Sequence, residues 1–255
     1  MEIFQKAIQE RLKRDYAISV VPITDSTNKD ARAMAEAGAP EGATLFARAQ
    51  TAGRGRLGRS FFSPDGSGLY FSVVLRPKAA DALKITIAAG VAVARAVKEV
   101  LGLELQIKWV NDLYYQNKKV CGILAEGLCA PQGGLTYCVL GIGINVAAPK
   151  EGFGALSSIA GALLEKADDA LLGALGGAIL EHFFALYEDL SQPAMIKEYQ
   201  DRSFLQDKKI LLARGDEKIP CIVTGISEEG ALLARGLDGA AYAFSSGEVQ
   251  ILCFE

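Results

Sequence analysis

The stretch Gln50-Thr51-Ala52-Gly53-Arg54-Gly55-Arg56-Leu57-Gly58-Arg59 is a glycine- and arginine-rich loop that directly follows a strand-like segment, residues 44–50. Glycine lets the backbone take unusual angles and lets its N–H groups approach a ligand closely. Arginine supplies a planar, permanently charged fork that suits phosphate or carboxylate. The stretch therefore predicts a loop that binds an anion, although by itself it fits a solvated basic loop or an RNA-contacting tail equally well.

Hydrophobic periodicity on both sides of this loop predicts a chain that mixes strands and helices. Strands are expected at residues 16–23, 44–50, 69–76, 105–109, 113–115, 119–126 and 135–145. Helices are expected at residues 1–14, 25–38 and 82–101, and residues 152–199 are expected to be mostly helical. The segment Asp25 to Asn28 offers side-chain oxygens that would cap the second helix. These elements predict a fold of the α+β class.

The tail of the chain has a different character. Short strand-like runs at residues 209–213, 219–226, 231–234, 241–244 and 249–253 are broken by glycine and aspartate. Such spacing indicates a small β-barrel-like appendage. We therefore expect two domains, residues 1–205 and 206–255, with the boundary near Leu205.

Composition limits the classes of protein to which the chain can belong. Half of its 255 residues are hydrophobic, which predicts a sizeable core, and its net charge of −3 excludes a general attraction to nucleic acid or to anionic membrane. The first residues carry charges where a secretory signal needs apolar side chains. The longest apolar run, residues 170–180, is shorter than the roughly 20 residues that span a bilayer. Any basic site must therefore be local.

The cysteines and the single histidine exclude further kinds of site. Five scattered cysteines, with no Cys-x-x-Cys pair, do not form a zinc site or a disulfide framework, so a reducing cytosol is expected. His182 lies in a helical pattern, which favours a packing or surface role over service as a catalytic base. No residues are firmly assigned to a metal.

A second candidate site is Lys108-Trp109-Val110-Asn111-Asp112, at the end of an expected strand. Lys108 could provide a point charge for a carboxylate or a phosphoryl oxygen. Asn111 and Asp112 could hold a metal or orient a nucleophile. The alternative is a strand-ending turn with a lysine whose ammonium group reaches solvent, and this alternative is stronger for Asn111 and Asp112 than for Lys108.

Two further segments carry weaker indications. Gly141-Ile142-Gly143-Ile144-Asn145 ends an apolar strand, where glycine often marks close approach by another backbone or by a ligand. A Rossmann phosphate loop is excluded there because the Gly-x-Gly-x-x-Gly pattern is incomplete and no helix follows at once. Ser26, Thr27 and Asn28 could hold a polar ligand head as well as cap a helix.

Taken together, these segments resemble the biotin–protein ligase family. The resemblance covers most of the chain, in the order found in the family, and the Gly-Arg loop with the Lys-Trp-x-Asn-Asp run is its most specific part. The matching stretches are Asp25–Asn28, Gln50 with Gly53–Arg59, Phe62–Pro64, Lys108–Asp112, Lys119–Glu126, Gly141–Asn145, Gly230–Leu233 and Ser246–Val249.

This resemblance implies an architecture, an activity and a set of partners. The fold would be a mainly antiparallel mixed sheet with flanking helices, as in class II synthetases, followed by a small SH3-like β-barrel. Biotin and ATP, with Mg²⁺, would give biotinyl-5′-adenylate, and a lysine of a biotin carrier protein would then displace AMP. The enzyme would be cytoplasmic, with no nucleic-acid or membrane partner. Some relatives dimerise through the sheet, so a homodimer stays an open alternative.

The resemblance also implies roles by position. The catalytic residues would be Lys108, Arg54 and Arg56, with Asp112 as a base or orienting group for the acceptor lysine. The biotin-binding residues would be Ser26, Thr27, Asn28, Gln50, Arg54, Gly55, Arg56, Lys108, Gly122, Ile123, Leu124, Gly141 and Gly143. The nucleotide-binding residues would be Arg56, Arg59, Phe61, Asn111 and Asn145.

The chain departs from the family pattern at two positions. Val110 stands where relatives usually have proline, which changes the stiffness of the turn but not its charge. Phe61 stands where tryptophan is frequent near the adenine, so less area is available for stacking. Many bacterial relatives also carry an N-terminal DNA-binding domain, for which about twenty residues before the first expected strand leave no room, so no repressor role is expected.

Three rival functions remain open at this point. A lipoate–protein ligase would share the fold and the two-step chemistry. A nucleic-acid-binding protein could use the arginine-rich loop, but the net negative charge and the lack of interleaved aromatic residues argue against it. A biotin sensor without catalysis would bind biotin and form no AMP adduct.

Overall fold

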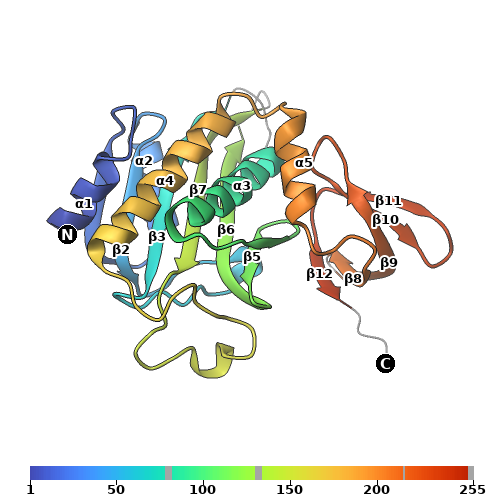
Figure 1. The fold of residues 1–255 in the computed structure, drawn as a ribbon. Coiled ribbons are helices and arrows are strands. Elements are labelled where there is room, and N and C mark those ends of the chain that lie inside the picture. Colours follow the sequence, from blue (N-terminus) through green and yellow to red (C-terminus); the bar gives the residue numbers. More distant parts are fainter. Residues whose placement is uncertain (78–81, 130–133, 215, 252–255) are drawn as a thin grey trace.

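The computed structural model describes residues 1–77, 82–129, 134–214 and 216–251 (Figure 1). A seven-stranded sheet forms its centre, with strand order β1-β2-β3-β7-β6-β5-β4. The β1–β2 pair is parallel and the other pairs are antiparallel. The strands are β1 (Ile18–Thr24), β2 (Thr44–Gln50), β3 (Gly68–Leu75), β4 (Gln106–Lys108), β5 (Asp112–Tyr115), β6 (Lys118–Cys129) and β7 (Leu135–Asn145).

Helices lie on both faces of this sheet. One face is covered by α1 (Glu2–Gln9), α3 (Ala82–Leu101) and α4 (Asp169–Tyr187), and α5 (Pro193–Arg202) packs against α3. The opposite face carries α2 (Thr27–Glu36). Successive strand residues point to opposite faces, so Val73 belongs to the large core beneath α3 and α4, whereas Val74 packs against α2. The expected α+β class with a mainly antiparallel sheet is confirmed.

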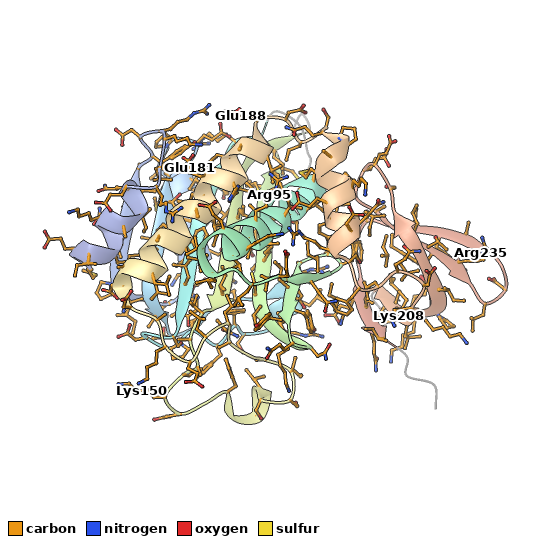
Figure 2. All side chains as sticks on the ribbon, viewed as in Figure 1. Arg95, Lys150, Glu181, Glu188, Lys208 and Arg235 are labelled. Atoms are coloured by element: carbon orange, nitrogen blue, oxygen red, sulfur yellow. The ribbon has the colours of Figure 1, made fainter. Side chains whose placement is uncertain are left out.

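The helical layer is held by packing and by charge. α3 presents small residues such as Ala88, Ala92 and Ala96 to the core, which lets it lie close to α4 and the sheet. Arg95, labelled in Figure 2, donates from α3 to Glu198 on α5 at 2.6 and 2.9 Å. α4 is long and apolar enough to cross a membrane, but 61% of its most apolar window is buried inside the protein, as in a core helix.

The prediction that residues 152–199 are mostly helical is only half right. Residues 152–168 form an extended loop with one 3-10 turn, Gly154–Leu156. Gly152 and Gly154 adopt positive φ angles of 67° and 52°, which interrupt helical geometry. The helix α4 starts only after Asp168, whose side chain accepts a hydrogen bond from Leu171 N at 2.8 Å.

The tail forms a separate five-stranded antiparallel sheet, with strand order β11-β10-β9-β8-β12. Its strands are β8 (Lys209–Arg214), β9 (Glu217–Ile226), β10 (Leu232–Gly236), β11 (Ala241–Phe244) and β12 (Glu248–Ile251), and the end of the run expected at 249–253 lies outside the described residues. The expected small C-terminal β domain is therefore present. Within the part described, β11 and β12 each pair with one neighbour, so no closed barrel is observed.

This second sheet sits beside α5 and the β4–β5 end of the central sheet (Figure 1). The indole of Trp109, 3% exposed, donates from Nε1 to Gly230 O at 3.1 Å. Gln200 on α5 donates to Ile226 O at 2.5 Å. These contacts fix the tail sheet next to the Lys108–Asp112 run. They also bring β8 and β12 to the edge of a cavity that Lys108 lines.

Candidate active site

A cavity of about 490 Å³ opens between the α2 face of the central sheet and the strands β8 and β12 of the tail. It brings together segments that are far apart in the sequence. With the exception of Asn145, all residues predicted for the site line it: Ser26, Thr27, Asn28, Gln50, Arg54, Gly55, Arg56, Arg59, Phe61, Lys108, Asn111, Asp112, Gly122, Ile123, Leu124, Gly141 and Gly143.

Glycines form the floor of this cavity. Gly141 and Gly143 lie on β7 and point to the α2 face, and Gly122 pairs with Gly143 from β6. A Cβ atom on Gly141 would lie 2.0 Å from Asn28 Oδ1, far inside any allowed contact, so only glycine fits beneath this amide. The floor therefore consists of bare backbone that a ligand or a neighbouring side chain can approach closely.

Residues Ser26 to Asn28 begin α2 over this floor. Ser26 is the N-cap residue, but its side chain makes no capping hydrogen bond, so the predicted capping role is wrong. Its Oγ is buried and has no hydrogen-bond partner. A buried hydroxyl without a partner is costly unless a ligand satisfies it, and Ser26 lines the cavity. This oxygen is the clearest indication that a polar ligand head binds here.

Gln50 connects this turn to the end of the Gly-Arg loop. Its Oε1 accepts from Thr27 N at 2.8 Å and from Thr27 Oγ1 at 3.2 Å. Its Nε2 donates to Ser63 Oγ at 2.9 Å, and Ser63 donates onward to Phe61 O at 3.0 Å. Both ends of the Gln50 amide are thus engaged, so the side chain is held firmly at the cavity wall.

The Phe61 ring rests on the glycine floor. Cβ atoms built on Gly143 and Gly122 would lie 2.7 and 3.2 Å from this ring. Its edge also meets Tyr70, with the ring centroids 6.3 Å apart. One half-exposed face of Phe61 lines the cavity, at the position where an adenine stack was expected.

The Gly-Arg loop forms a strap across the cavity mouth, held by an antiparallel bridge between Arg54 and Ser60 and by Gly55 N to Arg59 O at 2.7 Å. Each arginine has a different partner. Arg54 Nη1 lies 3.9 Å from Glu126 Oε1, and Arg56 donates to Asn111 Oδ1 at 3.1 Å. Arg59 forms two contacts of 2.8 and 2.9 Å with Glu248 on β12.

The Arg56–Asn111 contact joins the loop to the Lys108–Asp112 run. Asn111 is itself fixed, because its Nδ2 donates to Ile123 O at 2.9 Å. The intervening Trp109–Val110 peptide bond is cis. Val110 O accepts from the buried Tyr199 hydroxyl at 2.9 Å. The run is therefore held at a fixed position opposite the loop.

Lys108, Asp112 and Lys119 form a charged cluster on three neighbouring strands. Asp112 pairs in register with Lys108 across the β4–β5 turn, and its Oδ1 lies 2.5 Å from Lys119 Nζ. Burial lowers the pKa of Lys108 below its usual value near 10.5, Asp112 opposes this shift, and Lys119 adds to it. Lys108 is thus a partly desolvated cation, whose attraction to an incoming anion is stronger than in bulk water.

The cavity has a strong excess of positive charge, although the chain carries −3 overall. Among the described residues that line it, six side chains are basic (Arg54, Arg56, Arg59, Lys108, Lys119 and Lys218) and two are acidic (Asp112 and Glu248). Both acidic groups are already paired with basic ones. The local cationic site expected within an acidic protein is therefore present, and it suits a polyanionic ligand.

The structure also differs from the predicted site in identifiable ways. Asn145 points to the cavity face of β7, but its amide donates to Gly161 O at 3.0 Å and it does not line the cavity, so its predicted contact with the nucleotide is not supported. Lys119 lines the cavity, although the sequence predicts for it only a position at the start of a strand. Lys218 and the β12 segment also line the cavity, but the sequence around them has no local pattern that indicates a binding site.

Comparison with known proteins agrees with this arrangement. The model of the biotin/lipoate A/B protein ligase family matches residues 20–145, and that of the biotin protein ligase C-terminal domain matches residues 207–252. A biotin–[acetyl-CoA-carboxylase] ligase of Paracoccus denitrificans is 32% identical, over 85% of this chain and 93% of its own length. The chain belongs to the biotin protein ligase family. The matched regions contain the cavity floor, the strap and the tail strands.

Two further relatives extend the comparison. The bifunctional ligase/repressor BirA of Bacillus subtilis is 30% identical over 88% of this chain and 71% of its own length. The solved structure of a biotin protein ligase from Aquifex aeolicus, in complex with biotin and ATP, superposes with a TM-score of 0.72 at 29% identity. It covers 92% of this chain and 98% of that one. Family membership and fold are thus supported over nearly the whole chain.

Proposed function

We propose that this protein activates biotin with ATP to biotinyl-5′-AMP and pyrophosphate, and then transfers the biotinyl group to a lysine of a biotin carrier protein. The observation that carries the proposal is the placement of Lys108 and the Arg54–Arg59 strap around one cavity, above a floor of glycines and an unpartnered Ser26 hydroxyl. Relatives named as biotin ligases support the biotin assignment, and so does the match to a biotin-specific C-terminal domain.

The activation step needs positive charge and positioning more than it needs proton transfer. A biotin carboxylate oxygen attacks the α-phosphorus of ATP, the new C–O–P bond forms, and the bond to pyrophosphate breaks. The carboxyl group is already ionised at neutral pH, so no general base is required. Negative charge crowds the phosphoryl oxygens, and we propose that Lys108, Arg54 and Arg56, which line the cavity, offset it.

The two ends of the cavity suit the two substrates. The ureido ring of biotin would meet Ser26, Thr27, Asn28 and Gln50, with Ile123, Leu124 and the floor glycines beside its apolar part. The carboxylate would then point toward Lys108 and the strap. The nucleotide would lie along Arg56, Arg59, Asn111 and the exposed face of Phe61, toward the tail strands.

Magnesium would enter as the counterion of ATP. No group of three or more histidine, cysteine or acidic residues that could hold a metal is found within the described residues. The two acidic side chains on the cavity wall already have cationic partners. Mg²⁺ commonly binds through substrate phosphates and keeps several waters, so the substrate would be MgATP.

The transfer step needs a neutral amine on the acceptor, although a free lysine has a pKa of about 10.4. We propose Asp112 as the residue that receives or orients this amine. The side chain of Asp112 is 22% exposed and lies between Lys108 and Lys119. Because one of its oxygens is engaged by Lys119, an orienting role is better supported than full proton abstraction.

We also propose a domain boundary between residues 205 and 206 and a cytoplasmic location. The five tail strands begin at Lys209, and the C-terminal family model begins at residue 207. Four cysteines among the described residues are free thiols, which fits a reducing compartment: Cys121, Cys129, Cys138 and Cys221.

The test is to incubate the purified protein with MgATP and either biotin or lipoic acid, and to identify the products by mass spectrometry. Biotin should give biotinyl-5′-AMP and pyrophosphate, and an added biotin carrier domain should gain one biotinyl group on lysine. Adduct formation with lipoic acid alone would identify a lipoate ligase. Biotin binding without any AMP adduct would indicate a sensor.

A further inference from the structure

Glu126 on β6 contacts both halves of the proposed active site without lining the cavity itself. Its Oε2 accepts a hydrogen bond from Asn28 Nδ2 at 2.8 Å, and its Oε1 lies 3.9 Å from Arg54 Nη1. Asn28 is 5% exposed, whereas the Glu126 side chain is 46% exposed. A partly solvated carboxylate therefore holds a buried amide at the biotin end of the cavity.

The Asn28 amide continues into a buried hydrogen-bond chain. Its Oδ1 lies 2.6 Å from Ser72 Oγ, and the same Ser72 oxygen lies 2.8 Å from Thr27 Oγ1. Ser72 is completely buried. A hydroxyl carries one proton, so Ser72 donates to only one of these two neighbours. The direction of donation along the chain is therefore set by whatever fixes its end at Asn28.

A carboxylate accepts hydrogen bonds and cannot donate them, so Glu126, at 2.8 Å and with the Leu124 carbonyl as a more distant acceptor at 3.5 Å, fixes that end. It keeps Nδ2 of Asn28 toward β6 and Oδ1 toward Ser72. Ser72 then donates its single proton to Asn28 Oδ1, while the Thr27 hydroxyl donates to Gln50 Oε1, so the lone pairs of Thr27 Oγ1 receive no proton from Ser72 and can accept from a ligand. The unpartnered Ser26 oxygen lies beside it. The Thr27 oxygen then favours a ligand head that brings N–H donors, and the free Ser26 hydroxyl can donate or accept.

The geometry points to Glu126 as a positioning residue that sets the amide orientation of Asn28 and, through Ser72, makes the biotin end of the cavity selective for a head group with N–H donors. This inference rests on the proposed function. Without the carboxylate, the Asn28 amide can turn over and the hydroxyl chain can reverse. Ser72 would then donate to Thr27 Oγ1 and occupy a lone pair that a ligand N–H would otherwise use, and the match to the two ureido N–H groups of biotin would be lost.

The experiment measures binding of biotin and of lipoic acid by calorimetry, and the KM for ATP in pyrophosphate exchange, for the wild type and three Glu126 variants. Lipoic acid has the same carboxylate chain but no N–H group in its head. Glu126→Ala and the longer Glu126→Met should weaken biotin binding about tenfold or more. Both should leave lipoic acid binding and the KM for ATP unchanged within twofold. Glu126→Gln should stay within threefold of wild type, because its amide oxygen still accepts from Asn28.

Glu36→Ala is the matched control. Glu36 is also a half-exposed carboxylate with one hydrogen bond, from the Tyr137 hydroxyl, and one ion pair, with Arg32. Unlike Asn28 and Arg54, these two partners do not line the cavity. Glu36→Ala should leave the Kd for biotin, the Kd for lipoic acid and the KM for ATP unchanged. Three results would each overturn the inference. In the first, a Glu126 variant loses affinity for biotin and for lipoic acid equally. In the others, Glu126→Ala binds biotin as the wild type does, or Glu126→Gln binds biotin as weakly as Glu126→Ala. Failure of the wild type to bind biotin would instead overturn the proposed function.

Discussion

Replacement of Gly141 by alanine should remove biotin binding while leaving the protein folded. The added Cβ would lie 2.0 Å from Asn28 Oδ1 and 2.8 Å from Asn28 Cγ, whereas carbon and oxygen atoms normally stay more than about 3.3 Å apart. The amide must therefore retreat by more than about 1 Å. That displacement breaks its 2.6 Å contact with Ser72 and its 2.8 Å hydrogen bond to Glu126.

The size of the effect follows from these contacts. A neutral hydrogen bond contributes about 0.5–1.5 kcal/mol and one to a charged group about 1.5–3 kcal/mol. Disturbing both should weaken biotin binding by about 2–4 kcal/mol, which corresponds to a Kd raised about 30- to 700-fold. Overpacking should also lower the free energy of unfolding by about 1–3 kcal/mol.

The assay is calorimetric biotin binding, accompanied by thermal unfolding. Gly122→Ala is a matched control on the same floor. Its added Cβ would lie 3.2 Å from the Phe61 ring, which can shift slightly, so the affinity for biotin should change less than about fivefold. Gly90→Ala on α3 meets nothing closer than 3.6 Å and should bind biotin normally. If Gly141→Ala binds biotin within threefold of wild type, the assigned position of the biotin head is wrong.

Three further predictions concern the charged groups. Burial lowers the pKa of Lys108, so its cation is lost at lower pH than that of a free lysine; the exchange rate should fall as pH rises through this lowered pKa, and Lys108→Arg should shift that decline to higher pH. A decline that is identical in both proteins would exclude Lys108 as its cause. The strap Gly53–Arg59 should be cut by trypsin at least tenfold more slowly once biotin and MgATP are added, and unchanged cleavage would exclude closure over the ligand. Asp112→Ala should slow transfer from preformed biotinyl-5′-AMP at every pH, and a wild-type transfer rate would rule out its role.

Much of the site could be predicted because its residues lie in short runs whose chemistry is local. Glycines alternating with arginines after a strand, and a lysine at a strand end, already indicate an anion site. The alternation along β7 also places Gly141 and Gly143 on one face. The structure adds the reason for these glycines, since they accommodate the Asn28 amide and the Phe61 ring.

Other features depend on contacts between distant segments and could not be predicted. The pairing of Asp112 with Lys119 results from the β5–β6 register, and the contact of Arg59 with Glu248 depends on how the tail sheet packs. Ser26 resembles a helix cap in the sequence, but its hydroxyl makes no capping hydrogen bond and stays without a partner at the cavity wall. The pattern over residues 152–199 predicts mostly helix, but residues 152–168 form a loop, to which Lys118 donates at Ser157 O and Ser158 O.

The most direct test of the account is biotin-dependent ATP–pyrophosphate exchange by the wild type, Lys108→Ala, Arg56→Ala and the control Lys118→Ala. Lys118 is next to the cavity residue Lys119 in sequence but does not line the cavity. The account predicts exchange in the wild type and in Lys118→Ala, and at least a hundredfold loss in Lys108→Ala and in Arg56→Ala, about 2.7 kcal/mol of transition-state stabilisation. Exchange at the wild-type rate in both Lys108→Ala and Arg56→Ala would contradict the assignment of this cavity as the site of activation.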